Sequence, residues 1–209
     1  MKLFSICVYF RIIMVFVSSE KQCFYEVRTL FQRVVSLGSN CAVAYHLKRL
    51  GKRPEAYPFD WAKISINSLV QVLENKFDKF NELTPKKYSN NFINFETSET
   101  GSWLMTNPYN VTFAHEAIES LADRLTHRIH RFYQLKNPTF VRLETNNLNS
   151  NQIKSYYRLT SILDQLFDNY KFIVISNKII QHPKIIWIQL DNFDSDWKYE
   201  NLEWESILI

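Results

Sequence analysis

Hydrophobic and polar residues alternate between strand-like and helix-like spacing along most of this chain. Residues 33–37, "RVVSL", are a short run of β-branched and aliphatic residues, which predicts a buried strand. Residues 38–40, "GSN", supply a flexible turn and helix-capping side chains. Residues 42–50 then follow as a helix, with Gly51 as its stop.

The last third of the chain has the clearest alternation. Residues 139–144, 171–176 and 184–190 are apolar on both faces and predict strands, and residues 153–170 predict a helix between the first two. Strands of this kind, separated by helices, are typical of a parallel sheet covered on both sides. We therefore predict a single α/β domain, a three-layer sandwich with a mostly parallel central sheet.

The middle of the chain is less regular. Apolar residues recur at helical spacing over about 65–80 and again over about 116–135, which predicts two amphipathic helices. The second helix carries three basic residues opposite its apolar stripe: Arg124, Arg128 and Arg131. Residues 81–112 are polar and aperiodic and predict a long loop. Pro54 and Pro58 place the segment around Asp60 on another loop.

The amino terminus permits two interpretations. Residues 3–17, "LFSICVYFRIIMVFV", have the apolar core of a secretory signal. However, Arg11 interrupts the run, and the run is too short to span a bilayer. We favour a poorly ordered or amphipathic extension over residues 1–32, followed by the α/β domain over 33–209, and expect no stable membrane insertion.

Composition narrows the function classes. The 209 residues carry 25 Lys and Arg against 21 Asp and Glu, a net charge of +4, and the basic residues are scattered, which argues against a nucleic-acid partner. Cys7, Cys23 and Cys41 offer neither a disulfide framework nor zinc-site spacing, so we expect a reducing, cytoplasmic location, no metal and no cofactor.

Cys41 lies where ligand sites gather in parallel sheets, just past the carboxyl end of a strand and at the first turn of a helix. Free backbone N–H groups and the helix dipole there are expected to lower the thiol pKa and to provide an oxyanion hole. The alternative is a small buried cysteine that simply fits a crowded turn.

A nucleophilic cysteine requires a base, and histidine is the usual one. His46 lies about one and a half turns along the same helix and points elsewhere. His127 and His130 are expected in solvent, and His182, beside a proline, is a turn residue. His115 remains, just before the second amphipathic helix, either as the base or as a residue that flanks the helix start.

Three further side chains could enter the same site. Asp60 is either an orienting or acid–base carboxylate or a turn carboxylate, and Trp61 beside it is either a substrate contact or a core anchor. Arg142 and Glu144 alternate with apolar residues on a predicted central strand, so charge lies where burial is expected. Either these two residues form structural pairs with neighbouring groups, or they lie near the end of the strand and enter the site. Glu144 is the better placed of the two to enter the site.

The stretch "SLGSNCAVAYHLKRLGKRPEAYPFDW" resembles the signature of the DUF1796 family, described as papain-like cysteine peptidases. The GSNC and PFDW pair at this spacing carries the resemblance. Weaker matches follow over the rest of residues 33–209: "FAHE", "HRIHRF", "FVRLE" and "WKYENLEWESIL". The resemblance implies a cysteine hydrolase with Cys41 as nucleophile, His115 as base and Asp60 as the other matched polar position. Glu116 stands where the family pattern leads us to expect an aspartate, so the third catalytic group is not assigned.

The papain fold pairs a helical half with a barrel-like half, whereas this chain alternates strand and helix, so for architecture we keep the α/β prediction. Our first hypothesis is hydrolysis of a peptide or other acyl substrate, with Ser39, Asn40, Trp61 and Glu144 as substrate or oxyanion contacts. The second is a non-catalytic or transferase-like module that binds a phosphorylated or sugar-nucleotide ligand at the strand-end cleft. The third is an inactive structural relative.

Overall fold

The computed structural model describes residues 33–86, 104–113, 116, 119–179, 181–194 and 196–208. All of them belong to one compact unit, Gln32–Ile209. The extension predicted for residues 1–32 lies outside the described residues and stays a prediction. Among the helices of the described ranges, none combines the length and the apolar character that a membrane crossing requires.

A parallel sheet forms the centre of this unit. Its four strands follow the order β1-β6-β7-β8 and are all parallel: β1 (Val34–Ser36), β6 (Thr139–Leu143), β7 (Lys171–Ser176) and β8 (Ile186–Gln189). Phe140 is paired with Val35 on one side and Phe172 on the other, which fixes the register of the first three strands. The predicted α/β class and parallel central sheet are confirmed.

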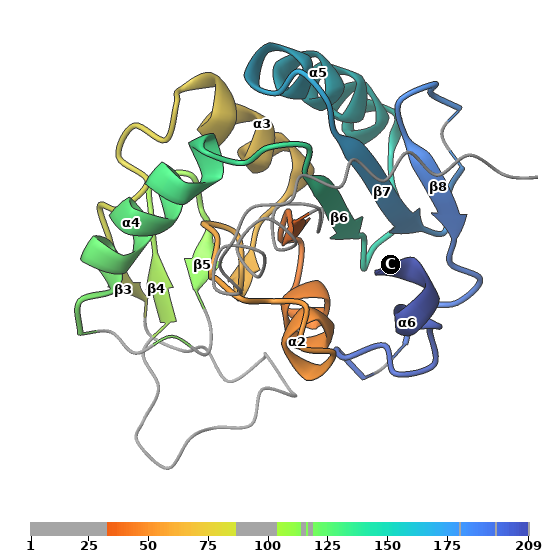
Figure 1. Ribbon diagram of the computed structural model, residues 1–209, viewed down its shortest axis with the longest axis horizontal. Coiled ribbons are helices and arrows are strands. Elements are labelled where there is room, and N and C mark those ends of the chain that lie inside the picture. Colours follow the sequence, from red (N-terminus) through yellow and green to blue (C-terminus); the bar gives the residue numbers. More distant parts are fainter. Residues whose placement is uncertain are drawn as a thin grey trace, which may run out of the picture. The chain divides into compact units, whose positions relative to one another are not determined.

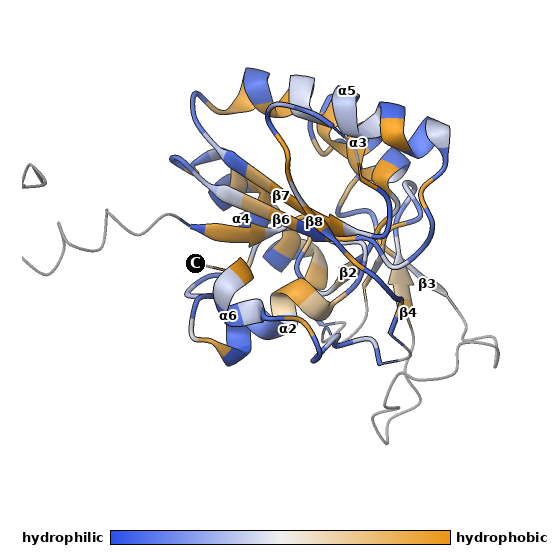
Figure 2. Ribbon diagram, turned by 90° about the vertical axis from the view of Figure 1, so that its right-hand side faces the viewer, coloured by the Kyte–Doolittle hydropathy of each residue, from blue (hydrophilic) through white to orange (hydrophobic). Residues whose placement is uncertain are grey.

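Helices lie on both faces of this sheet (Figure 2). One face is covered by α2 (Ala42–Arg49) and α6 (Trp204–Ile207), the other by α3 (Ile66–Glu74) and α5 (Ser150–Leu166). Successive strand residues alternate between two apolar clusters, as expected for a sheet buried on both faces: Phe140 and Phe172 join the α3/α5 cluster, whereas Val141 and Ile173 join the α2/α6 cluster.

A second, antiparallel sheet was not predicted from the sequence. Its strands follow the order β2-β5-β4-β3: β2 (Ala62–Lys63), β5 (Thr112–Phe113), β4 (Leu104–Thr106) and β3 (Thr84–Lys86). The prediction of a long loop over 81–112 is therefore wrong at its two ends. This sheet and α4 (Leu121–Tyr133) lie beside the parallel sheet (Figure 1), so a simple three-layer sandwich is not established.

Local sequence features explain where helix α5 begins and where helix α3 ends. Asn149 and Gln152 form a reciprocal capping box, so α5 begins at Ser150, three residues before the predicted start. Helix α3 ends at Glu74, before its predicted end at residue 80, and Phe77 follows with a positive φ of 62°. That turn brings Phe77 against Phe59 and Phe132, so apolar burial continues although the helix has stopped.

Candidate functional site

Cys41 is the N-cap residue of α2 and follows the carboxyl end of β1, as the sequence predicted. A tight turn leads to it, in which Gly38 and Ser39 have positive φ angles of 73° and 76°. Asn40 Oδ1 accepts a hydrogen bond of 3.1 Å from the Ala42 amide, which holds the turn against the start of the helix. The Cys41 side chain itself makes no capping hydrogen bond.

The thiol of Cys41 is buried, with only 3% of the residue exposed. Burial and the negative charges of Glu116 and Asp60 raise its pKa to about 12, against a smaller lowering by Lys63. The expectation of a lowered pKa is therefore wrong, because desolvation of the thiolate outweighs the dipole of an eight-residue helix. The resting sulfur is a neutral thiol.

Asp60 is the first of two carboxylates within electrostatic range of the Cys41 sulfur. Its Oδ2 accepts hydrogen bonds from Arg53 Nε at 2.8 Å and from the Tyr57 amide at 3.0 Å. Its Oδ1 is buried and has no hydrogen-bond partner in the described part of the chain. Burial raises the pKa of Asp60, although the Arg53 guanidinium opposes the shift. Arg53 and the Tyr57 amide thus hold one oxygen of this carboxylate, and no group of the described residues holds the other.

Glu116 is the second carboxylate. It accepts two hydrogen bonds from the Arg128 guanidinium, at 2.5 and 3.2 Å, and lies 3.5 Å from Arg124 Nη2. Arg128 is only 6% exposed, so its expected place on the outer face of the helix is wrong; pairing with Glu116 makes the burial tolerable. Glu116 directly follows His115 in the chain. His115 lies outside the described residues, and its role as base stays a prediction.

Three of the four other histidines contact groups other than Cys41, and His127 is exposed, in line with the expectation from the sequence. His46 contacts the Lys198 carbonyl at 2.7 Å and stacks on Trp204. His130 contacts Gln134, and His127 is exposed. His182 accepts a hydrogen bond from the Lys184 amide within its turn.

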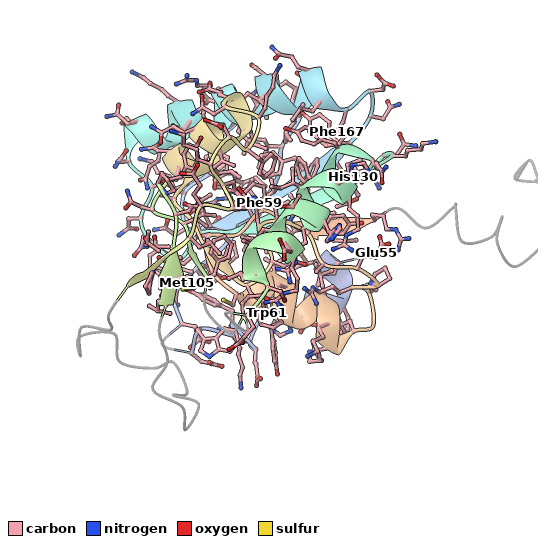
Figure 3. All side chains as sticks on the ribbon, turned by 90° about the vertical axis from the view of Figure 1, so that its left-hand side faces the viewer. Glu55, Phe59, Trp61, Met105, His130 and Phe167 are labelled. Atoms are coloured by element: carbon pink, nitrogen blue, oxygen red, sulfur yellow. The ribbon has the colours of Figure 1, made fainter. Side chains whose placement is uncertain are left out.

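The residues predicted to contact substrate are joined to other parts of the protein. Ser39 Oγ donates to Glu144 Oε2 at 3.2 Å, and Asn40 Nδ2 donates to the Trp197 carbonyl at 3.4 Å. Trp61 is half-buried, and the Arg53 guanidinium lies 5.8 Å from its ring centroid. In Figure 3, Phe59 lies in the packed interior, whereas Trp61 lies toward the lower edge of the view. The structure thus brings the GSNC and PFDW segments to the same end of the sheet through Cys41 and Asp60.

Sequence reasoning missed Arg53 and Arg128, the cations that accompany the two carboxylates. Arg53 could have been suspected, since it stands seven residues before Asp60 in a proline-bounded loop. The burial of Arg128 could not have been predicted, because its spacing along the helix places it on the same face as Arg124 and Arg131. Within the described ranges, no group of three or more His, Cys, Asp or Glu side chains is arranged to hold a metal ion.

Comparison with known proteins gives two findings. Residues 32–177 match the family described as "Putative papain-like cysteine peptidase (DUF1796)". The chain is also similar to "Uncharacterized protein R408" of Acanthamoeba polyphaga mimivirus, with 28% identity over 222 aligned positions that cover 87% of this chain and 97% of the relative. The family match contains both the GSNC and the PFDW segments.

Proposed function

Because this chain belongs to the DUF1796 family, we propose that it is a cysteine-dependent acyl hydrolase or acyltransferase in which Cys41 is the nucleophile. The observation that carries the proposal is the setting of this thiol. It follows a strand of a parallel sheet, starts a helix, and has the buried carboxylate of Asp60 within electrostatic range.

The raised pKa of Cys41 determines the order of steps. A neutral thiol must lose its proton as it attacks, so His115 acts as a general base instead of resting in a thiolate–imidazolium pair. The sulfur adds to the carbonyl carbon while its proton moves to the imidazole. The leaving group takes that proton as the carbon–leaving-group bond breaks, and a thioester remains. Water or another nucleophile then releases the acyl group and regenerates the thiol.

Asp60 would orient the base in this scheme. Its Oδ1 is a buried acceptor without a partner among the described residues, which suits the N–H of an imidazole whose other nitrogen takes the thiol proton. A carboxylate so placed fixes the tautomer and stabilises the imidazolium that forms. The amides at the start of α2 are the candidate donors to the oxyanion, but the Ala42 amide is bound to Asn40 at rest and must be released to serve.

The test is acylation by a small activated ester, p-nitrophenyl acetate. We expect a stoichiometric burst of p-nitrophenolate and an acetyl group on the peptide that contains Cys41, located by mass spectrometry. Cys41→Ala should abolish the adduct, and His115→Ala should slow its formation roughly 100-fold or more. Equal acylation of other cysteines, or a burst that survives Cys41→Ala, would overturn the proposal.

One observation favours a second candidate, the ligand-binding module without catalysis. The sulfur is almost inaccessible, so a reagent reaches it only after local rearrangement. In such a module Cys41→Ser would leave ligand binding unchanged, and p-nitrophenyl acetate would leave no adduct on the wild-type cysteine.

A further inference from the structure

A second group of buried polar residues lies directly under the turn that carries Cys41. We call it the arginine cluster: Arg142, Glu144, Tyr156 and Ser39. Arg142 Nε donates to Glu144 Oε1 at 2.7 Å, and the Tyr156 hydroxyl donates to the same oxygen at 2.5 Å. Burial and the charge of Glu144 raise the pKa of Tyr156 well above its ordinary value, so this hydroxyl keeps its proton and remains a donor.

The guanidinium of Arg142 also joins the two segments that carry the candidate site. Nη1 donates to the Leu37 carbonyl at 2.8 Å, immediately before Gly38, and Nη2 donates to the Ile64 carbonyl at 3.0 Å, just after β2. The first contact fixes the end of β1 that leads to Cys41, and the second fixes the strand that follows Asp60 and Trp61. A single fully buried side chain thus sets the spacing of both segments.

Glu144 extends this support to the turn itself. Its second oxygen accepts from Ser39 Oγ at 3.2 Å, two residues before Cys41. Ser39 has a positive φ of 76°, a conformation that costs a non-glycine residue energy and needs a contact to maintain it. A continuous series of hydrogen bonds therefore connects Arg142 in the sheet interior, through Glu144, to Ser39 in the turn that positions the Cys41 thiol.

We propose that Arg142 and Glu144 are positioning residues, which act through Ser39 to hold Cys41 in register with the PFDW segment. The inference rests on the proposed function for its catalytic meaning but makes a separate geometric claim. Glu144 is then a support for the turn and not a substrate contact. The same claim explains why Arg142, in the central strand β6, and Glu144, just after its end, are charged at buried positions that normally favour apolar residues.

The sharpest test compares two rates in Ser39→Ala, which removes one hydroxyl and leaves the interior intact. Freed from Glu144, the turn should open more often, so the alkylation rate of Cys41 by iodoacetamide should rise at least tenfold. Acylation by p-nitrophenyl acetate should fall at least tenfold in the same variant, because the thiol is no longer aligned. Glu144→Gln and Arg142→Lys should behave alike, since neither restores the full set of contacts.

Leu163→Ala is the matched control, because it destabilises the interior from α5 and removes none of the hydrogen bonds of the arginine cluster. Both rates are compared at denaturant concentrations that equalise global stability. Rates in Ser39→Ala that match the control would overturn the positioning role. If wild type shows no acylation of Cys41 at all, the proposed function fails, while the alkylation rates still decide whether the cluster holds the turn.

Discussion

Two buried polar clusters meet at this end of the sheet, and they differ in how completely their groups are paired. In the arginine cluster, both oxygens of Glu144 accept hydrogen bonds, and Arg142 donates from all three of its nitrogens. The second group, the cysteine cluster, comprises Cys41, Asp60, Glu116, Arg53 and Arg128. There one oxygen of Asp60 has no partner in the described residues, and the charges of Glu116 and Asp60 oppose ionisation of the thiol more than Lys63 favours it.

This difference in pairing indicates that the arginine cluster stabilises the fold and that the cysteine cluster carries the reactive groups. Fully paired buried groups are rigid and expensive to disturb, whereas a buried acceptor without a partner is a cost that a protein rarely keeps without a use. We therefore expect substitutions in the arginine cluster to affect mainly folding and alignment. Substitutions in the cysteine cluster should affect mainly reactivity and pH dependence.

The largest loss of unfolding free energy is expected from Arg142→Met, in the arginine cluster. Removal of the guanidinium leaves Glu144 buried without its counter-charge and two backbone carbonyls without donors, a loss of about 3–5 kcal/mol of unfolding free energy. Chemical denaturation measures it. Arg158→Met is the control, because Arg158 pairs with Glu74 at the surface and should cost less than about 1 kcal/mol. Similar losses in both variants would contradict a structural role for the arginine cluster.

The next largest effect is expected from Gly38→Ala, at the turn between the clusters. An added Cβ would overlap Ile64 Cγ2, and φ is +73°, so strain and overlap combine to roughly 2–4 kcal/mol. Gly51→Ala is a close match, with φ of +67° and open space around the new Cβ, and should cost only about 1 kcal/mol. Equal melting temperatures for the two variants would show that the turn can move away from Ile64.

A smaller change in stability, whose direction depends on pH, is expected from Asp60→Asn. Because burial raises the pKa of Asp60 above its ordinary 3.8, the folded state binds a proton at this carboxyl more tightly than the unfolded chain does. The stability that this preference contributes is complete below about pH 3.8 and is lost as the pH rises through the raised pKa. The stability of the wild type relative to Asp60→Asn, measured by denaturation at a series of pH values, should therefore fall as the pH increases from about 4. A rise over that range would mean that the Arg53 ion pair outweighs burial.

The smallest effect is expected at the surface. Arg49 and Glu205 form an ion pair at 2.8 Å with side chains 42% and 59% exposed. Glu205→Gln should leave the unfolding free energy unchanged within the error of the denaturation assay, since solvent screens such pairs. A clear loss of unfolding free energy in this variant would show that exposed ion pairs stabilise the protein as buried ones do.

The sequence predicted the parallel sheet well, because strands such as 171–176 are buried on both faces and carry an unmistakable apolar run. It missed the antiparallel sheet, whose strands are only two or three residues long and are defined by their partners. The position of Cys41 could be read from the strand, turn and helix around it. Its ionisation could not, because the pKa depends on Glu116 and Asp60, which approach only in the folded chain.

The proposed chemistry depends most on one step, in which Cys41, neutral at rest, loses its proton to His115 as it attacks. The pH dependence of Cys41 acetylation by p-nitrophenyl acetate, followed on the Cys41 peptide in wild type and in His115→Ala, reports on this step. We expect a rate that rises with one ionisation near the ordinary histidine pKa of about 6.5, then levels off, and that loses this dependence in His115→Ala. A rate that climbs steadily with hydroxide toward pH 12, identically in both proteins, would contradict the role of His115 as base.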